Sequence, residues 1–228
     1  MNQEKLSDYL AGWNDCKRCN LCNTMRKGLV FGEGDPNSKI MFIGEWPKNQ
    51  MNESQGKCML DKELTLFYDA LDYFGTSAKD VFITPMLSCR PVDDMGTTTK
   101  PQVKNIKICA ERVEEMIDII DPLVLVLIGQ QAFNRFGKNE HNKYTYANLT
   151  SDPKPFESVT IGKSGAEIRR SSVVIRPLEW TIEKETGKSG GPAHKMLMSL
   201  QMAFAILDNY NHYMHGIERP ARKEVIDL

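Results

Sequence analysis

An unbroken apolar run at residues 40–43 is the feature that most restricts how this chain can fold. Its sequence is IMFI, polar residues precede it, and it stops at Gly44-Glu45-Trp46-Pro47. A short run that is apolar at every position is typical of a strand buried on both faces of a parallel sheet. Ligands of such sheets bind beyond the carboxyl ends of the strands. Glu45 is therefore a candidate catalytic carboxylate, although a solvent-exposed loop glutamate would show the same pattern.

Three further apolar runs alternate with helical patterns along the chain. The runs cover residues 81–84, 123–128 and 173–175, and the main helical patterns cover 61–74, 101–120 and 193–209. Such alternation predicts a parallel sheet with right-handed crossovers, and a short hairpin is expected in the polar region between the last two strands. We predict an α/β fold with a central four-stranded parallel sheet flanked by helices. We expect one domain over residues 1–210 and a tail over 211–228.

Composition places the chain among ordinary globular proteins. It has 228 residues, 41% of them hydrophobic and 26% charged, with a formal net charge of −1. A near-neutral charge means that any surface for nucleic acid must be local rather than global. The N-terminal sequence has no apolar core of a signal peptide, and no run reaches the length of a membrane span. We therefore expect a cytoplasmic protein that does not contact membranes, and we expect a monomer.

Three clustered cysteines indicate a metal centre near the N-terminus. Cys16, Cys19 and Cys22 have the spacing C-x2-C-x2-C, and a fourth ligand would have to come from Cys58, Cys89 or Cys109. Cysteines in an intracellular chain are more often ligands or plain thiols than disulfides. The spacing alone fits a zinc ion or an iron–sulfur cluster.

Six short motifs follow one another in a specific order along the chain. Residues 16–21, 31–35, 44–47, 82–84, 88–91 and 127–132 are similar, in that order, to the motifs C-x2-C-x-L, FGEGDP, GEAPG, ITN, KCRPP and LG-x-x-A. Each is weak alone, but their order is specific. Together they resemble the iron–sulfur branch (families 4 and 5) of the uracil-DNA glycosylase superfamily, which is also labelled after a domain related to a bacteriophage DNA polymerase. The resemblance extends from about Asp15 to Asp208. The resemblance implies a three-layer fold and base excision from DNA.

The resemblance also implies which cysteines bind metal. Cys16, Cys19, Cys89 and Cys109 stand at the positions of the ligands of a [4Fe–4S] cluster, and Cys22 and Cys58 would be spare. The cluster would have a structural role and would tie the N-terminal loop to a distant helix.

The catalytic part of the resemblance is less complete. Glu45 matches the acidic residue that would stabilise an oxocarbenium-like sugar and place a water molecule. Four neighbouring positions depart from the family and would form the substrate-binding pocket together with Gly44 and Trp46. Lys48 replaces a glycine, Met59 a stacking phenylalanine, Pro85 a base-reading asparagine and Arg176 a catalytic histidine. Arg176 would remain a cation facing the leaving base.

The segment after the fourth strand is the predicted DNA contact. Residues 138–195 contain ten Lys or Arg against seven Asp or Glu, an excess of +3. Pro177, Leu178 and Trp180 follow the strand directly, and Leu178 or Trp180 would be the wedge pressed into the duplex unless it belongs to the core. Two hypotheses follow: a DNA glycosylase with altered base choice, or a catalytically silent relative that binds nucleic acid or a replication or repair protein.

Overall fold

A six-stranded mixed sheet forms the centre of the protein. The computed structural model describes residues 2–23, 27–137, 143–162, 165–185 and 190–215. The strand order is β1-β3-β2-β4-β6-β5. The strands are β1 (Glu33–Gly34), β2 (Ile40–Gly44), β3 (Phe82–Pro85), β4 (Val124–Ile128), β5 (Phe156–Ile161) and β6 (Glu167–Ile175). The four central strands β3, β2, β4 and β6 are parallel, as predicted, and the two edge strands are antiparallel to their neighbours.

The two edge strands were not counted in the prediction of a four-stranded sheet. β1 has only two residues, too few for a periodic pattern. β5 and β6 form the expected hairpin, but β6 begins at Glu167, six residues before the apolar run at 173–175. The first half of β6 is polar because it pairs only with the edge strand β5, and one of its faces is open to solvent. A strand segment that is covered on one face alternates in burial rather than being apolar throughout.

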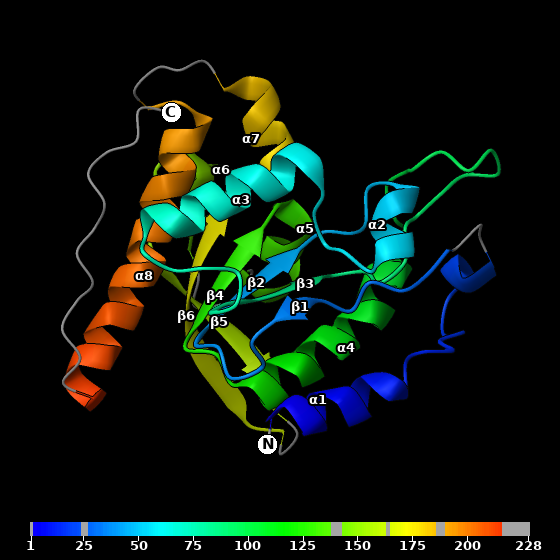
Figure 1. The fold of residues 1–228 in the computed structure, drawn as a ribbon, viewed down its shortest axis with the longest axis horizontal. Coiled ribbons are helices and arrows are strands. Elements are labelled where there is room, and N and C mark those ends of the chain that lie inside the picture. Colours follow the sequence, from blue (N-terminus) through cyan, green and yellow to red (C-terminus); the bar gives the residue numbers. More distant parts are fainter. Residues whose placement is uncertain (1, 24–26, 138–142, 163–164, 186–189, 216–228) are drawn as a thin grey trace.

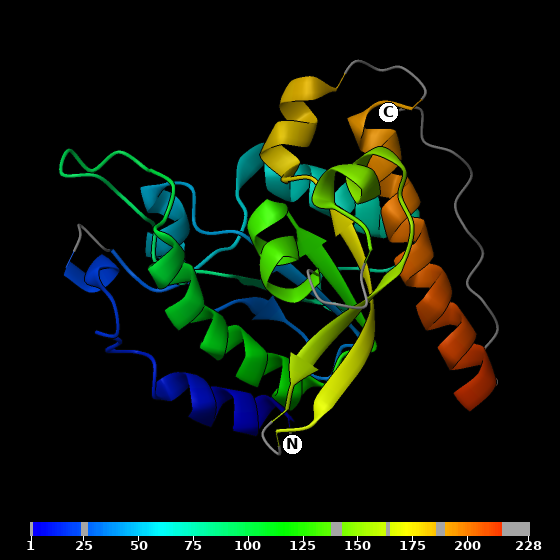
Figure 2. The ribbon, with the colours of Figure 1, turned by 180° about the vertical axis from the view of Figure 1, so that it is seen from behind.

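Helices cover both faces of the sheet and complete three layers (Figures 1 and 2). They are α1 (Asn2–Ala11), α2 (Gln50–Gln55), α3 (Asp61–Tyr73), α4 (Val103–Ile120), α5 (Gln130–Ala132), α6 (Tyr146–Ser151), α7 (Leu178–Lys184) and α8 (Pro192–His215), with the short turns η1 (Asn20–Asn23) and η2 (Phe133–Gly137). One core packs under α1, α4 and α6, and the other packs under α3, α7 and α8.

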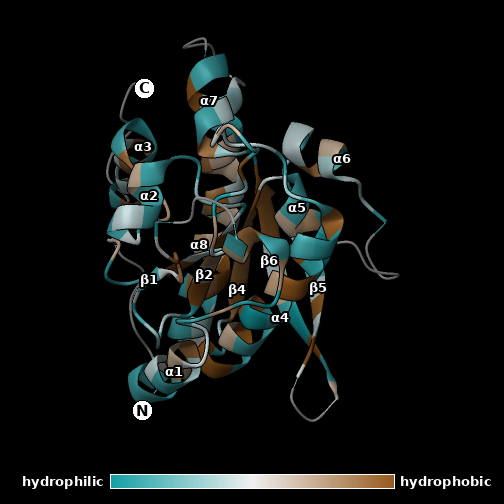
Figure 3. Ribbon diagram, turned by 90° about the vertical axis from the view of Figure 1, so that its right-hand side faces the viewer, coloured by the Kyte–Doolittle hydropathy of each residue, from teal (hydrophilic) through white to brown (hydrophobic). Residues whose placement is uncertain are grey.

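Alternate residues of each central strand point into different cores. In β2, Met41 and Ile43 belong to the α4 side, whereas Ile40 and Phe42 belong to the α3 and α8 side. This alternation is the two-residue period of a strand, and both of its phases are apolar because both faces are covered. Figure 3 shows the resulting concentration of hydrophobic residues on β2, β4 and β6. The apolar run from which the fold was predicted is therefore the centre of the molecule.

Two helix boundaries differ from the expected ones. α4 begins at Val103 with Gln102 as its N-cap, so Pro101 precedes the helix rather than lying in its first turn. α8 continues to His215, beyond the expected end near residue 209. The first five residues of the predicted tail are therefore helical, and residues 216–228 lie outside the described part of the chain. Among the described residues, no helix has both the length and the hydropathy to cross a bilayer.

Candidate active site

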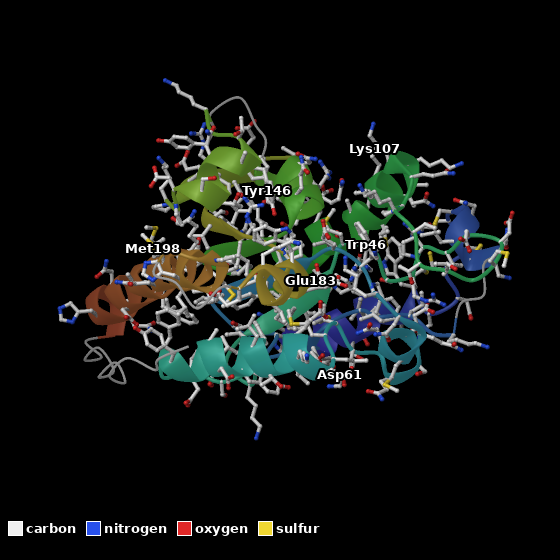
Figure 4. The ribbon with its side chains drawn as sticks, turned by 90° about the horizontal axis from the view of Figure 1, so that it is seen from above. Trp46, Asp61, Lys107, Tyr146, Glu183 and Met198 are labelled. Carbon is white, nitrogen blue, oxygen red and sulfur yellow. The ribbon has the colours of Figure 1, made fainter. Side chains whose placement is uncertain are left out.

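A cavity lies beyond the carboxyl ends of the parallel strands, where the sequence places Glu45. It is lined by Gly44, Glu45, Trp46, Lys48, Cys58, Met59, Glu63, Ile83, Pro85, Ile128, Pro177 and Leu178. Eight of these twelve residues were predicted site residues, and they come from four separate segments of the sequence. Figure 4 views the molecule from this edge and labels Trp46 of the cavity, Tyr146 at the start of α6 and Glu183 of α7. The structure thus brings most of the predicted pocket together.

Glu45 is held in place by its backbone and by its side chain. The amides of Met86 and Leu87 donate to the carbonyl oxygens of Gly44 and Glu45, at 2.9 and 3.1 Å, and so continue the β2–β3 ladder past Pro85. The side chain of Glu45 is only 12% exposed, and its Oε2 lies 3.4 Å from Nζ of Lys48. A carboxylate removed from water and placed by strand backbone is suited to stabilise positive charge in a site.

Gly129, at the start of α5, leaves the space that the Glu45 carboxylate occupies. Its backbone has φ 87° and ψ 169°, a region essentially reserved for glycine. A Cβ at this position would lie 2.6 Å from Cδ of Glu45 and 2.7 Å from its Oε1. In the sequence, Gly129 belongs to the motif at residues 127–132, and nothing in that motif indicates its contact with Glu45.

A buried ion pair supports the loop that carries Lys48. Nζ of Lys48 lies 4.4 Å from the centre of the Trp46 ring, and the Lys48 carbonyl accepts a hydrogen bond of 2.8 Å from the Thr98 hydroxyl. Arg90 donates to that hydroxyl at 3.0 Å and to Oε2 of Glu53 at 3.3 Å. Arg90 and Glu53 are both buried. The network therefore fixes the lysine that pairs with the candidate catalytic carboxylate.

A second buried arginine lies behind the wall that Pro85 forms. Arg112 of α4 is 0% exposed. It donates to the Phe31 carbonyl and to the Thr84 hydroxyl, both at 3.1 Å, and to the Pro85 carbonyl. Pro85 has no N–H, so its backbone offers no donor to a ligand in the cavity. The sequence did not single out Arg112, because its helical position shows no sign of contact with distant strands.

Arg176 lies beside this cavity rather than in its lining. Its guanidinium is 4.3 Å from the Trp180 ring centre and 5.9 Å from that of Tyr146. It lines a neighbouring cavity with Trp180 and Lys195. Burial raises the pKa of Tyr146 to about 12, the nearby cation of Arg176 opposes this rise, and the charge of Glu45 adds to it. Tyr146, which sequence reasoning did not select, is therefore within electrostatic reach of both predicted catalytic residues.

The lining of the cavity corrects the prediction for Leu178, and it includes two residues that the sequence did not indicate as pocket residues, Cys58 and Glu63. Leu178 is 4% exposed and packs in the core beside α8, so it is a core side chain and not an exposed wedge. Trp180 is partly exposed and remains the candidate wedge. Burial raises the pKa of the Cys58 thiol, which therefore stays neutral in the wall. Burial, with the charge of Glu179 second, also raises the pKa of Glu63.

The four cysteines predicted to bind metal line a second cavity. Cys16, Cys19, Cys89 and Cys109 share it with Trp13, Leu21, Leu29, Phe31, Leu87, Ser88 and Ile108, whereas neither Cys22 nor Cys58 is in its lining. The loop with Cys19 is tied to α4 by a hydrogen bond of 2.7 Å from Asn105 to Asn20. The four thiols therefore come from three segments that are far apart in the sequence. Two belong to the N-terminal loop, one to the loop after β3 and one to α4.

The chemistry of the cysteine cavity suits a metal group with sulfur ligands. The four cysteines surround a cavity whose other side chains, except that of Ser88, are aliphatic or aromatic. Four soft sulfur donors fit a zinc ion or an iron–sulfur cluster. Within the described ranges, no three Cys, His, Asp or Glu side chains are arranged so that they hold a metal ion as they stand.

Comparison with known proteins gives the family. Residues 31–175 match the family described as the uracil DNA glycosylase superfamily. Type-4 uracil-DNA glycosylases from Sulfurisphaera tokodaii and Thermotoga maritima are 30% and 29% identical over 129 and 122 residues, which are 54% and 53% of this chain. The chain spans 56% and 61% of the lengths of those two relatives. Because the family match covers more than half of the sequence and includes the ends of β2, β3 and β4 that line the cavity, this chain belongs to the uracil DNA glycosylase superfamily.

Proposed function

We propose that this protein is a DNA glycosylase that hydrolyses the N-glycosidic bond of a damaged or modified base, with a base choice different from plain uracil. The observation that carries the proposal is the position of Glu45, which is desolvated, fixed at the carboxyl end of β2 and paired with Lys48. The family membership and the names of the relatives, type-4 uracil-DNA glycosylases, support the same class of reaction.

The charged side chains of the cavity are opposite in sign to the charges that develop on the sugar and on the base during base excision. Breaking the bond leaves positive charge on the sugar and negative charge on the departing base. The carboxylate of Glu45 stabilises the sugar cation and orients the attacking water. The ammonium of Lys48, 3.4 Å from that carboxylate, stabilises the anionic base without having to donate a proton. Arg176 adds positive charge from the neighbouring cavity, where its guanidinium lies near the rings of Trp180 and Tyr146.

The base-facing walls support an altered base choice. Pro85 offers neither a side-chain nor a backbone donor to the edge of uracil. Met59 is 7% exposed in the wall and supplies a flexible thioether where an aromatic ring would stack. A site that lacks the donors and acceptors for a base edge discriminates poorly in favour of that base. We therefore expect weak or no excision of uracil and better excision of a modified base.

We further propose that Cys16, Cys19, Cys89 and Cys109 hold a [4Fe–4S] cluster. The cluster would link the loop after α1, the loop after β3 and the second turn of α4. Its contribution is structural, since the cysteine cavity and the Glu45 cavity share no lining residue. DNA is the proposed partner, with Pro177 and Trp180 on the binding face.

The alternative is a catalytically silent protein that binds nucleic acid or a replication or repair partner. The feature that favours it is the loss of base-reading groups at Pro85 and Met59, which is compatible with a pocket no longer used for excision. The two proposals differ in whether abasic sites form in DNA.

A base-excision assay distinguishes them. Duplex and single-stranded oligonucleotides with a panel of altered bases, including uracil, are incubated with the protein and cleaved with alkali at abasic sites. We expect cleavage with at least one modified base, and Glu45→Gln should reduce it by roughly 10²- to 10³-fold, the loss typical for one preorganised electrostatic group. Asp152→Asn, at an exposed carboxylate, is the control. Absence of cleavage throughout the panel, with DNA binding intact, would support the silent alternative. Efficient removal of uracil would contradict the proposed base choice.

A further inference from the structure

The wall of the cysteine cavity contains a buried hydroxyl that has no partner. Ser88 is 3% exposed. Its Oγ atom is shielded from solvent, and no described residue forms a hydrogen bond with it. Buried polar atoms are nearly always paired, so an orphaned one indicates a missing group. Ser88 lines the cavity together with the four cysteines.

Backbone hydrogen bonds fix the position of Ser88 beside the cysteine cavity. The Ser88 carbonyl accepts a hydrogen bond of 2.9 Å from Val30, and the preceding amide, that of Leu87, donates to Glu45. The residue is therefore anchored from both sides of its short loop. The next residue is Cys89, one of the proposed ligands.

We propose, on the basis of the cluster assigned above, that the Ser88 hydroxyl donates a hydrogen bond to a sulfur atom of the cluster and thereby raises its reduction potential. Cluster sulfides and cysteine thiolates are anionic acceptors, and the other lining side chains are aliphatic or aromatic. In a dry environment such a hydrogen bond is strong. Ser88 is a positioning and tuning residue for the cofactor and has no part in base excision.

The effect of the Ser88 hydroxyl on the reduction potential follows from the charge of the cluster. One-electron reduction adds negative charge to the cluster, and a donor aimed at sulfur stabilises the more negative state. Removal of the hydroxyl therefore lowers the midpoint potential. For Ser88→Ala we expect a decrease of about 59 mV, which for a one-electron couple is a tenfold change in the ratio of reduced to oxidised cluster at a fixed potential.

The experiment is a redox titration of the full chain purified without oxygen. Dithionite is the reductant, and visible absorbance and electron paramagnetic resonance report the fraction reduced. Ser38→Ala is the matched control, because Ser38 is equally buried at 3% but its Oγ is paired with the carbonyl oxygens of Ile40 and Asp80 at the opposite end of β2. We expect the control to retain the wild-type potential. Pulsed electron paramagnetic resonance of the reduced wild-type protein in D2O should show a coupling between the cluster and one exchangeable deuteron. This coupling should be lost in Ser88→Ala.

A second pair of variants keeps the test decisive if the Ser88→Ala variant incorporates little cluster. Ser88→Thr and Ser88→Val have the same shape and differ in the hydroxyl alone. We expect the threonine variant to keep the wild-type potential and coupling and the valine variant to lose both.

Two negative outcomes are distinguishable. Wild-type protein without an iron–sulfur cluster would overturn the proposed cofactor and, with it, the assignment for Ser88. A cluster-containing protein in which all variants share one potential and one deuteron spectrum would overturn the hydrogen bond alone. Neither result depends on whether the protein excises a base.

Discussion

Gly129 illustrates how a single residue sets the geometry of the candidate active site. It combines a backbone conformation that other residues adopt only with strain and a contact that a Cβ would make with the Glu45 carboxylate. Each of these two features requires glycine at position 129, but for a different reason. The backbone conformation is a local requirement of the turn, whereas the contact is imposed by Glu45, which follows β2. Their coincidence at one position links the turn after β4 to the position of the candidate catalytic group.

Substitution of Gly129 should therefore affect activity more than a comparable glycine elsewhere. Gly129→Ala is expected to destabilise the fold by about 1–3 kcal/mol through backbone strain and to displace Glu45, with a loss of excision similar to that of Glu45→Gln. Gly56→Ala is the matched control, because Gly56 also has a positive φ of 66° but its Cβ would meet nothing within 4 Å. Chemical denaturation and the excision assay report the two effects. Equal activity in both variants would contradict the proposed contact.

At the scale of elements, a carboxylate of α3 lies close to the first turn of α7. Glu63 of α3 lines the cavity, and it is within electrostatic reach of Glu179 in the first turn of α7. The pKa of Glu63 is raised, chiefly by burial and then by the charge of Glu179, while Lys48 opposes the rise. The folded state therefore binds the Glu63 proton more tightly than the unfolded state does.

This shift predicts a pH dependence of stability. The contribution of protonated Glu63 is complete below its ordinary pKa of 4.5, and it is lost as the pH rises through the higher pKa of the folded state. Glu63→Gln retains an acceptor oxygen but cannot ionise. The free energy of unfolding of this variant, relative to wild type, should therefore increase as the pH rises from about 4 to 7. Asp69→Asn, at an exposed position of the same helix, is the control. Parallel pH profiles for Glu63→Gln and wild type would refute the explanation.

At the scale of the whole molecule, the described N-terminal segment packs on the core through Leu6 and Leu21 but makes few polar contacts with the rest of the protein. Tyr9 of α1 donates to the Arg112 carbonyl at 3.5 Å, Arg18 lies 3.7 Å from Glu111, and Asn105 donates to Asn20. The cysteine cavity lies at this junction. A cluster there would provide the main covalent connection between the N-terminal loop and α4.

Loss of a proposed ligand should therefore affect the entire protein. Protein purified without oxygen is expected to be brown, with about four irons per chain. Cys89→Ala and Cys109→Ala should lose the colour and most of the soluble yield, because each removes a link between distant segments. Cys22→Ala should retain both, since Cys22 does not line the cavity. Metal analysis and visible spectra provide the measurement, and stoichiometric zinc without iron would contradict the assignment.

Several functional features could be predicted from the sequence because their signals are local or ordered along the chain. The apolar runs specify the four parallel strands, and the end of the run at 40–43 identifies Glu45 before any tertiary contact is known. The resemblance of ordered motifs selects four of six cysteines, and those four line one cavity. Leu178 was ambiguous from sequence, because an apolar residue after a strand is equally suited to a wedge or to the core.

The sequence by itself determined the order of the four parallel strands and the position of Glu45, since periodicity and strand ends report burial within a short segment. The candidate ligand set came from the resemblance of the ordered motifs to the family. Only the tertiary structure decided that Gly129 makes room for Glu45, that Arg112 holds the Pro85 carbonyl and that Arg176 lies beside the Tyr146 ring. Each of these contacts joins segments brought together by crossovers between strands. Their geometry depends on how helices pack on the sheet, and no local pattern of residues encodes it.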